Sequence, residues 1–294
     1  MNFIAKASLM NKAGNILGKI FTSNSSGGGW LVILRVGATI ALIGKILSEF
    51  SFINLLYGSQ GFVPKEIAVF SQKPYLPTIQ GIFQHVPGFC SEPFFLKVFF
   101  LIQLLFAFFL LVGFMTRLSA FACWLMMVIV FNSSHLTSYG FDAMLLSLLF
   151  YAMIFPTRKK NTNPWLMSIF HKTIQLHICL IYFVNGISKV SGHGWQDGGG
   201  LWDAINQPQF HSALTPLLQK VMLIPHVPAL IASSIILTEI AYPFLIWVRK
   251  INTVVLILII LLHVSIGVVM GLWLFAFTMI VFNLVAFGHV LWKN

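Results

Sequence analysis

One apolar segment of the sequence, Ile174–Val190, carries a regular stripe of polar side chains. Gln175, Tyr182 and Lys189 recur in it every seven residues, and seven residues turn an α-helix by about 700°, almost two full turns. The three side chains therefore lie on one face of a helix, with Asn185 beside them. In a membrane such a face must contact protein or water, because polar groups are costly in lipid.

Lys189 is the member of this stripe that could do chemistry. It lies at the predicted outer end of the helix, where partial burial disfavours the ammonium form and makes a lysine usable as a base. It could instead bind the carboxylate of a substrate. The alternative without chemistry is a lysine that snorkels to the outer lipid headgroups.

His135 and Asp142 are the other candidates for chemistry. Both lie near the predicted external ends of apolar segments, and they are close together in the sequence. We expect Asp142 either to orient the imidazole of His135 or to bind Lys189. Neither an H-x-x-x-H nor an H-E-x-x-H pair occurs, so we predict no metal site.

Glu239 lies inside another apolar segment and needs a partner of opposite charge there. Two cations, Arg35 and Lys45, lie within the first long apolar segment of the chain. We predict a structural ion pair between Glu239 and Arg35, with Lys45 as the alternative partner.

The composition shows which environment must hold these residues. Apolar residues make up 58% of the 294 residues and charged residues 9%, whereas soluble domains carry about 25% charged residues. The composition therefore excludes a soluble enzyme and predicts a membrane protein in contact with lipid. The net charge is +11, but the basic residues stand singly or in pairs between apolar runs. We interpret them as a topology signal and as contacts to anionic headgroups, and we expect no nucleic-acid partner.

Eight apolar segments approach the length of about 20 residues that a membrane-spanning helix needs. Helices are the default because each backbone N–H must be satisfied within its own segment. We predict an all-α polytopic bundle of about eight transmembrane helices, with a tight turn at Gly271. Basic residues concentrate in alternate connections, which places both termini in the cytoplasm. The predicted spans are Trp30–Leu47, Phe94–Phe114, Leu118–Phe131, Phe141–Phe155, Ile174–Val190, Val227–Val248, Ile251–Met270 and Leu272–Leu291.

The remaining segments complete the predicted organisation. Residues 1–29 read as a basic amphipathic helix on the membrane surface, followed by a Gly/Ser hinge, and residues 30–294 read as one transmembrane domain. Two external loops, Ser48–Pro93 and Ser191–His226, are too long to be simple connectors. Both are rich in glycine and aromatic residues, and we expect them to fold back on the bundle.

Several motifs in this order resemble those of a known family. The stretch Tyr182-Phe183-x-x-Gly186-x-x-Lys189, followed by Trp195-x-Asp197-Gly198, is similar to the central signature of the HTTM superfamily, which includes the vitamin K-dependent γ-carboxylases. The resemblance covers roughly residues 30–292. The other matching pieces are Leu34–Gly37, Tyr57–Pro64, Asn132-x-x-His135, Gly140-x-Asp142 and Phe275–Asn283.

The resemblance implies roles for individual residues. Lys189 matches the lysine that acts as the base toward vitamin K hydroquinone, and His135 matches the active-site histidine. It therefore implies an external site with Lys189, His135 and Asp142 as catalytic residues and a quinone or hydroquinone as a candidate cofactor. The substrate-binding residues would be Tyr182, Asn185, Trp195, Asp197 and Gly198.

The carboxylases continue into a large extramembrane domain, whereas this sequence ends at Asn294. The short stand-alone members, similar to the bacterial sporulation-delaying protein B (SdpB) family, are therefore the better match. They imply a multi-pass protein of the bacterial inner membrane that takes part in the maturation, modification or export of a secreted toxin or antimicrobial peptide. The site would be an external-face pocket under the two long loops. Its partners would be membrane lipid, the precursor peptide and other proteins of the maturation system. Two alternatives stay open, a carboxylase-like quinone-dependent enzyme and a non-catalytic immunity or export factor, so whether the chain is an enzyme also stays open.

Overall fold

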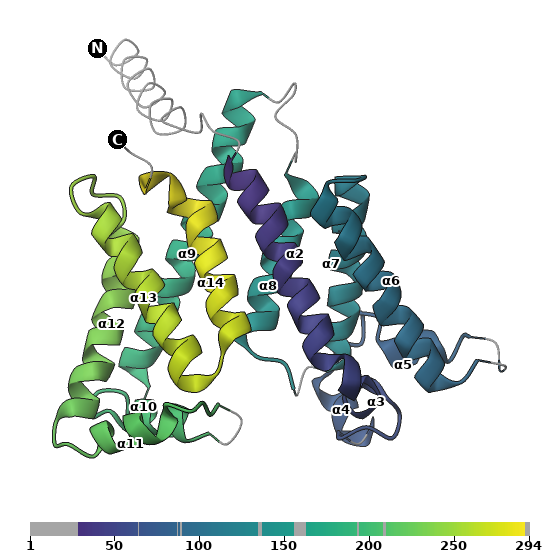
Figure 1. The fold of residues 1–294 in the computed structure, drawn as a ribbon, viewed down its shortest axis with the longest axis horizontal. Helices are drawn as coiled ribbons and strands as arrows, with labels where there is room; N and C mark the ends of the chain where they lie inside the picture. The colour runs from purple at the N-terminus through teal and green to yellow at the C-terminus, as the bar shows by residue number, and fades with distance from the viewer. Residues whose placement is uncertain are drawn as a thin grey trace, which may run out of the picture.

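A computed structural model describes most of the chain after the N-terminal segment (Figure 1). The described residues are 29–63, 65–86, 88, 90–134, 137–155, 163–192, 194–207 and 210–291. Within these ranges every regular element is a helix, which confirms the predicted all-α bundle. The predicted surface helix and all but the last residue of its hinge, within residues 1–29, lie outside the described residues.

Seven helices in the described part of the chain are long and apolar enough to cross a membrane. An eighth apolar helix, α8 (Gly140–Ile154), is shorter but packs inside the bundle against α2, α7 and α14. The chain therefore has the architecture of a multi-pass membrane protein. The seven are α2 (Gly29–Glu49, continued by η1 Phe50–Phe52 and α3 Ile53–Tyr57), α6 (Glu92–Val112), α7 (Thr116–Ser133), α9 (Pro164–Ser191), α12 (Val227–Leu245), α13 (Asn252–Met270) and α14 (Trp273–Phe287, continued by η2 Gly288–Val290).

Local sequence explains where these helices begin and end. Proline at a first helical position is tolerated because its missing N–H would have no partner there, and Pro164 starts α9 after Asn163 has capped it. Helix α6 ends at Gly113 in the left-handed conformation, with φ 83°. Gly271 has φ 71° and separates α13 from α14, which confirms the predicted tight turn.

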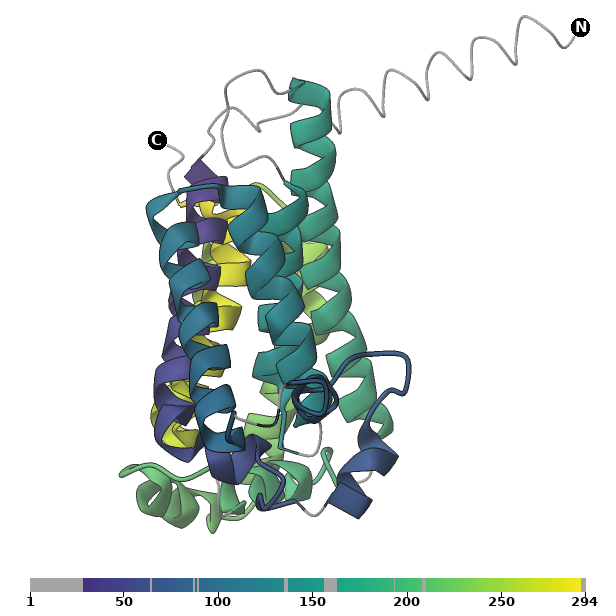
Figure 2. The ribbon, with the colours of Figure 1, turned by 90° about the vertical axis from the view of Figure 1, so that its right-hand side faces the viewer.

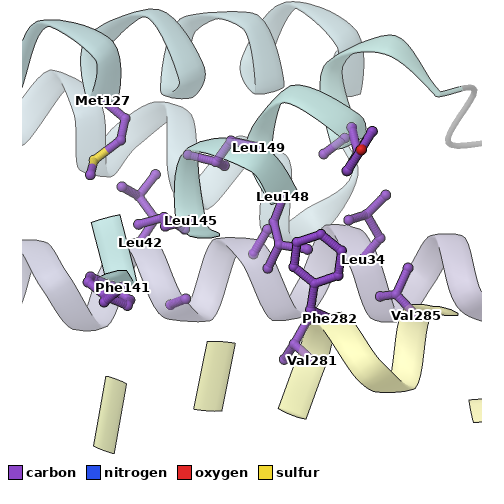
Figure 3. Packing of buried hydrophobic residues seen from close by; sticks show 14 of the residues in the cluster. Leu34, Leu42, Met127, Phe141, Leu145, Leu148, Leu149, Val281, Phe282 and Val285 are labelled. Atoms are coloured by element: carbon purple, nitrogen blue, oxygen red, sulfur yellow. The ribbon is translucent and has the colours of Figure 1, made fainter. Parts of the chain in front are cut away.

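The core of the bundle forms around α2, where α8 and α14 meet it. Figure 3 shows Leu34 of α2, Leu148 of α8 and Phe282 of α14 packed together, and all three side chains are at most 1% exposed. Close packing of this kind replaces the hydrophobic effect as the force between helices in lipid, and it favours small residues at crossings. Gly37 of α2 is such a residue, because a Cβ atom there would overlap both methyl groups of Val281 in α14.

The short helices gather at one end of the bundle. Helices α3, α4 (Lys65–Ser71) and α5 (Ile79–Phe83) of the first long loop lie at the same end as α10 (Gly199–Asn206) and α11 (Thr215–Met222) of the second (Figure 1). Figure 2 shows the long helices running in a common direction, with short helices lying across their ends. Both loops thus fold back at the same end of the bundle.

Replacing Gly37 by alanine should test the contact between α2 and α14. The added methyl group has no room beside Val281, so we expect the free energy of unfolding to fall by about 1–3 kcal/mol, as for other overpacked sites. Gly29→Ala is the matched control, since a Cβ at Gly29 meets no atom within 4 Å. The measurement is thermal unfolding of the purified variants in detergent, and equal stability of both variants would contradict the close contact.

Candidate functional site

Lys189 of α9 forms an ion pair with Glu239 of α12. The Nζ atom of Lys189 donates to both carboxylate oxygens of Glu239, at 2.7 and 2.5 Å. The lysine side chain is 21% exposed and the glutamate side chain 10%. Gly186 lets the two helices approach, since a Cβ atom there would lie 2.6 Å from Ile240 Cγ1. The pair is therefore held in a close helix crossing, and the lysine side chain remains partly exposed.

Trp195 covers the amine of Lys189. The Nζ atom lies 5.3 Å from the centroid of the Trp195 ring, within the range of a cation–π interaction. The indole in turn rests on Gly200, where a Cβ atom would approach its ring to 2.8 Å. The second long loop thus places an aromatic side chain over the amine of the ion pair.

Asp197 and Gly198, two predicted substrate-binding residues, shape this loop. The carboxylate of Asp197 accepts a hydrogen bond of 2.9 Å from the backbone N–H of Gly199, at the start of α10. Gly198 has φ 88°, and a side chain there would overlap Pro228 at the start of α12. Their observed contacts are therefore structural ones that hold α10 and Trp195 in place, and their role toward a substrate stays a prediction.

The predicted ion pair between Arg35 and Glu239 is wrong. The Nη1 atom of Arg35 donates instead to the backbone carbonyls of Leu110 and Leu111, each at 2.9 Å. These carbonyls lie in the last turn of α6, where helical partners run out. The sequence could not reveal this interaction, because a backbone acceptor can belong to any residue type.

The expected pairing of Asp142 with Lys189 is also wrong. Asp142 Oδ1 lies 2.7 Å from Lys45 Nζ of α2, and its Oδ2 accepts the backbone N–H of Tyr139 at 3.0 Å. Lys45 also binds Glu49 at 2.6 Å. Asp142 is thus tied to a second charged cluster at the start of α8, which also uses it as a capping residue.

His135, the second predicted catalytic residue, lies outside the described residues, so its place beside Asp142 stays a prediction. Within the part of the chain that the structure describes, no group of three histidine, cysteine, aspartate or glutamate side chains could hold a metal ion.

The polar stripe of α9 faces protein, as predicted, but Tyr182 does not line an open pocket. Its side chain is 1% exposed, and its hydroxyl lies 2.7 Å from His263 Nε2 of α13 and 2.7 Å from Asn283 Nδ2 of α14. Tyr242 of α12 donates to the same asparagine at 2.7 Å. This buried network joins four helices. Each of its members is an isolated polar residue in an apolar run, which is the signal that could have identified them.

Gln175 of the stripe and Asn185 beside it have different surroundings in the structure. Gln175 is buried and donates to the backbone carbonyl of Ala286 at 2.7 Å. Asn185, a predicted substrate-binding residue, is exposed and makes no hydrogen bond to a described residue. The site around Lys189 therefore does not extend along the whole stripe.

An apolar cavity of about 180 Å³ lies beside Trp195, between α10, α11, α12 and α13. Its walls include Leu201, Ile205 and Met222, which belong to a small hydrophobic cluster that also contacts Trp195. The predicted spans did not indicate which residues line this cavity, because the lining depends on how the second loop folds back. The candidate site thus combines an ion pair, an aromatic cover and an apolar cavity. Comparisons of the chain with protein-family models, curated proteins and solved structures found no match.

Replacing Glu239 by glutamine should test the coupling in the ion pair. The change leaves the ammonium of Lys189 without a charged partner, and we expect the free energy of unfolding to fall by about 1–3 kcal/mol, less than for a fully buried pair because the lysine is partly exposed. The double variant Lys189→Met/Glu239→Gln should recover part of this loss. Thermal unfolding in detergent of Lys189→Met, Glu239→Gln and the double variant gives a double-mutant cycle.

The exposed Asp203 of α10 provides the control, since Asp203→Asn removes a carboxylate that has no charged partner among the described residues. We expect a change below about 0.5 kcal/mol for it. Strictly additive losses in the cycle would show that Lys189 and Glu239 are not coupled.

Proposed function

We propose that the chain is a member of the HTTM superfamily in a bacterial inner membrane, and that it matures, modifies or helps to export a secreted toxin or antimicrobial peptide. The observation that carries this proposal is the Lys189–Glu239 pair beneath Trp195. It lies at the matching position of the central signature, and the lysine remains partly open. An ionisable pair in a spanning helix is a site candidate by default, because its desolvation is costly.

The pair offers two kinds of chemistry to a peptide. A substrate carboxylate could replace Glu239 as the partner of the Lys189 ammonium, and the freed Glu239 could then bind an amine. For Lys189 to act as a base, its ammonium must first lose a proton, and Glu239 is the acceptor at hydrogen-bond distance. Both roles use the same two side chains, but only the second requires a neutral lysine.

A quinone- or hydroquinone-dependent carboxylase-like enzyme is the second candidate. The apolar cavity beside Trp195 favours it, because its lining suits the apolar chain of such a cofactor. Leu201, Ile205 and Met222 would hold that chain, and the bound group would supply redox chemistry. A non-catalytic immunity or export factor is the third candidate, and it needs only the fold and not the basicity of Lys189.

Removing the gene from the producing cells should change the mass or the amount of at least one secreted peptide. If Lys189 is a base, Lys189→Arg should abolish the effect as fully as Lys189→Ala, by about a hundredfold or more, since arginine does not release its proton. If Lys189 only binds a carboxylate, Lys189→Arg should keep much of the activity. The measurement is mass spectrometry of the culture medium.

Lys220→Arg is the matched control, because this exposed lysine lies in α11 at the same end of the bundle. It should behave as the unchanged chain. Identical secreted peptides with and without the gene would overturn the proposed function. Full activity in both Lys189→Ala and Lys189→Arg would leave only the non-catalytic factor.

The quinone alternative predicts a bound quinone in the purified protein. Extraction of the detergent-purified chain with organic solvent, followed by mass spectrometry, should then yield a quinone in near-stoichiometric amount. Ile235→Trp should displace it, because Ile235 lines the apolar cavity and a larger side chain fills the space. Leu237→Trp, on the exposed side of the same helix at 69% exposure, should leave it bound. Absence of quinone from the unchanged chain would exclude this alternative.

A further inference from the structure

A second cavity, of about 280 Å³, lies at the same end of the bundle but is built by the first long loop. It opens between α4, α5 and the last residues of α7. Its lining mixes apolar side chains such as Val63 and Val69 with the hydroxyl and amide side chains of several neighbours. Among the described residues that line it, no side chain carries a charge. Neither the Lys189 pair nor the apolar cavity beside Trp195 shares a lining residue with it.

The amide side chains of this cavity retain unused hydrogen-bonding groups. Gln72 is half-buried and Gln84 is exposed at the rim, and neither side chain bonds to a described residue. Gln80 donates its Nε2 group to the Tyr57 carbonyl and to Glu92, both at 2.6 Å, which leaves its Oε1 atom free to accept. Three carboxamides thus present donors and acceptors to the same space.

The walls of the cavity are held in place before any ligand binds. Asn132 of α7 accepts the backbone N–H of Lys73 at 2.8 Å and donates to the carbonyl of Leu76 at 3.0 Å. Ser133 accepts the N–H of Ile79 at 2.8 Å, at the start of α5. The loop is therefore fixed to the end of a long helix, and fixed walls lower the entropic cost of binding.

The chemistry of the lining selects a class of ligand. A glutamine carboxamide carries the same N–H and C=O groups as a peptide bond, so it can bond to an extended backbone through both. The apolar walls suit small side chains of such a segment. A sugar would need an open aromatic face, but the ring of Tyr57 is packed on Phe100 at 5.2 Å and is 4% exposed.

We propose that this cavity binds a short uncharged segment of a peptide through its backbone. The preference for peptide backbone follows from Gln72, Gln80 and Gln84 alone. That the peptide is the secreted substrate handled at Lys189 rests on the proposed function. The first loop then holds the peptide while the second loop presents its Trp195-covered ion pair to another part of it.

Photo-crosslinking in the producing cells tests the cavity directly. We expect full-length chain with p-benzoylphenylalanine in place of Gln84 to form a crosslinked product that mass spectrometry identifies as a peptide. The same substitution at His85 is the matched control, because His85 is the next residue, is also exposed, and does not line the cavity. Adducts that contain only lipid or polysaccharide, or equal peptide adducts at both positions, would overturn the proposal.

A second variant, Gln72→Ala, shows whether the peptide adduct at Gln84 depends on the carboxamides or on a local folding defect caused by the probe. Gln72→Ala removes a side chain without hydrogen bonds to the described residues, so the fold should tolerate it. Combined with the probe at Gln84, it should lower the yield of the peptide adduct by roughly threefold to tenfold, the effect of losing one or two hydrogen bonds. Gln196→Ala, in the other long loop, should not change the yield. An unchanged yield in Gln72→Ala would overturn the assignment of the carboxamides.

The outcomes separate this proposal from the proposed function. If gene removal changes a secreted peptide but Gln84 captures none, the cavity proposal fails and the function stands. If Gln84 captures a peptide while secreted peptides are unaffected by gene removal, the cavity binds peptide and the proposed function fails.

Discussion

A charged group inside an apolar helix bundle needs a partner from another helix, and this constraint decides which helices lie side by side. Arg35 joins α2 to α6 through two backbone carbonyls. Lys45 joins α2 to α8 through Asp142. Lys189 joins α9 to α12 through Glu239. Each cation would be costly to bury alone, so each of these contacts excludes helix arrangements in which the partner lies elsewhere.

Neutral polar groups also join neighbouring helices in one half of the bundle. Tyr182, His263, Asn283 and Tyr242 bring α9, α12, α13 and α14 to a common point. Glycines then allow the close approach that these contacts require, at Gly186 between α9 and α12 and at Gly37 between α2 and α14. The Lys189 pair is therefore held by a rigid set of four helices, and the loop that covers it does not have to create the site.

The sequence predicts the helices well and their partners poorly, for a physical reason. Hydropathy and the seven-residue spacing determine which residues lie on a helix face and whether that face avoids lipid, so the stripe of α9 and the turn at Gly271 are confirmed. Hydropathy and spacing do not determine which neighbouring helix packs against that face. Arg35 binds two backbone carbonyls, although Glu239 was an equally good partner by charge. Asp142 binds Lys45, although Lys189 was an equally good partner by charge. A pocket under the two long loops was predicted, but the residues that line the two cavities were not, because they depend on how the loops fold back.

The two roles considered for Lys189 place opposite demands on its surroundings. Glu239 pairs with the Nζ atom of Lys189, and the ring of Trp195 lies over it. A carboxylate-binding role uses the charged amine of this pair, since an incoming carboxylate only has to compete with Glu239. A base needs the neutral amine, so the proton of Lys189 must first pass to another group, and Glu239 is the acceptor at hydrogen-bond distance. The two roles therefore use the same contact differently, because Glu239 is displaced by the substrate in the first role and receives a proton in the second.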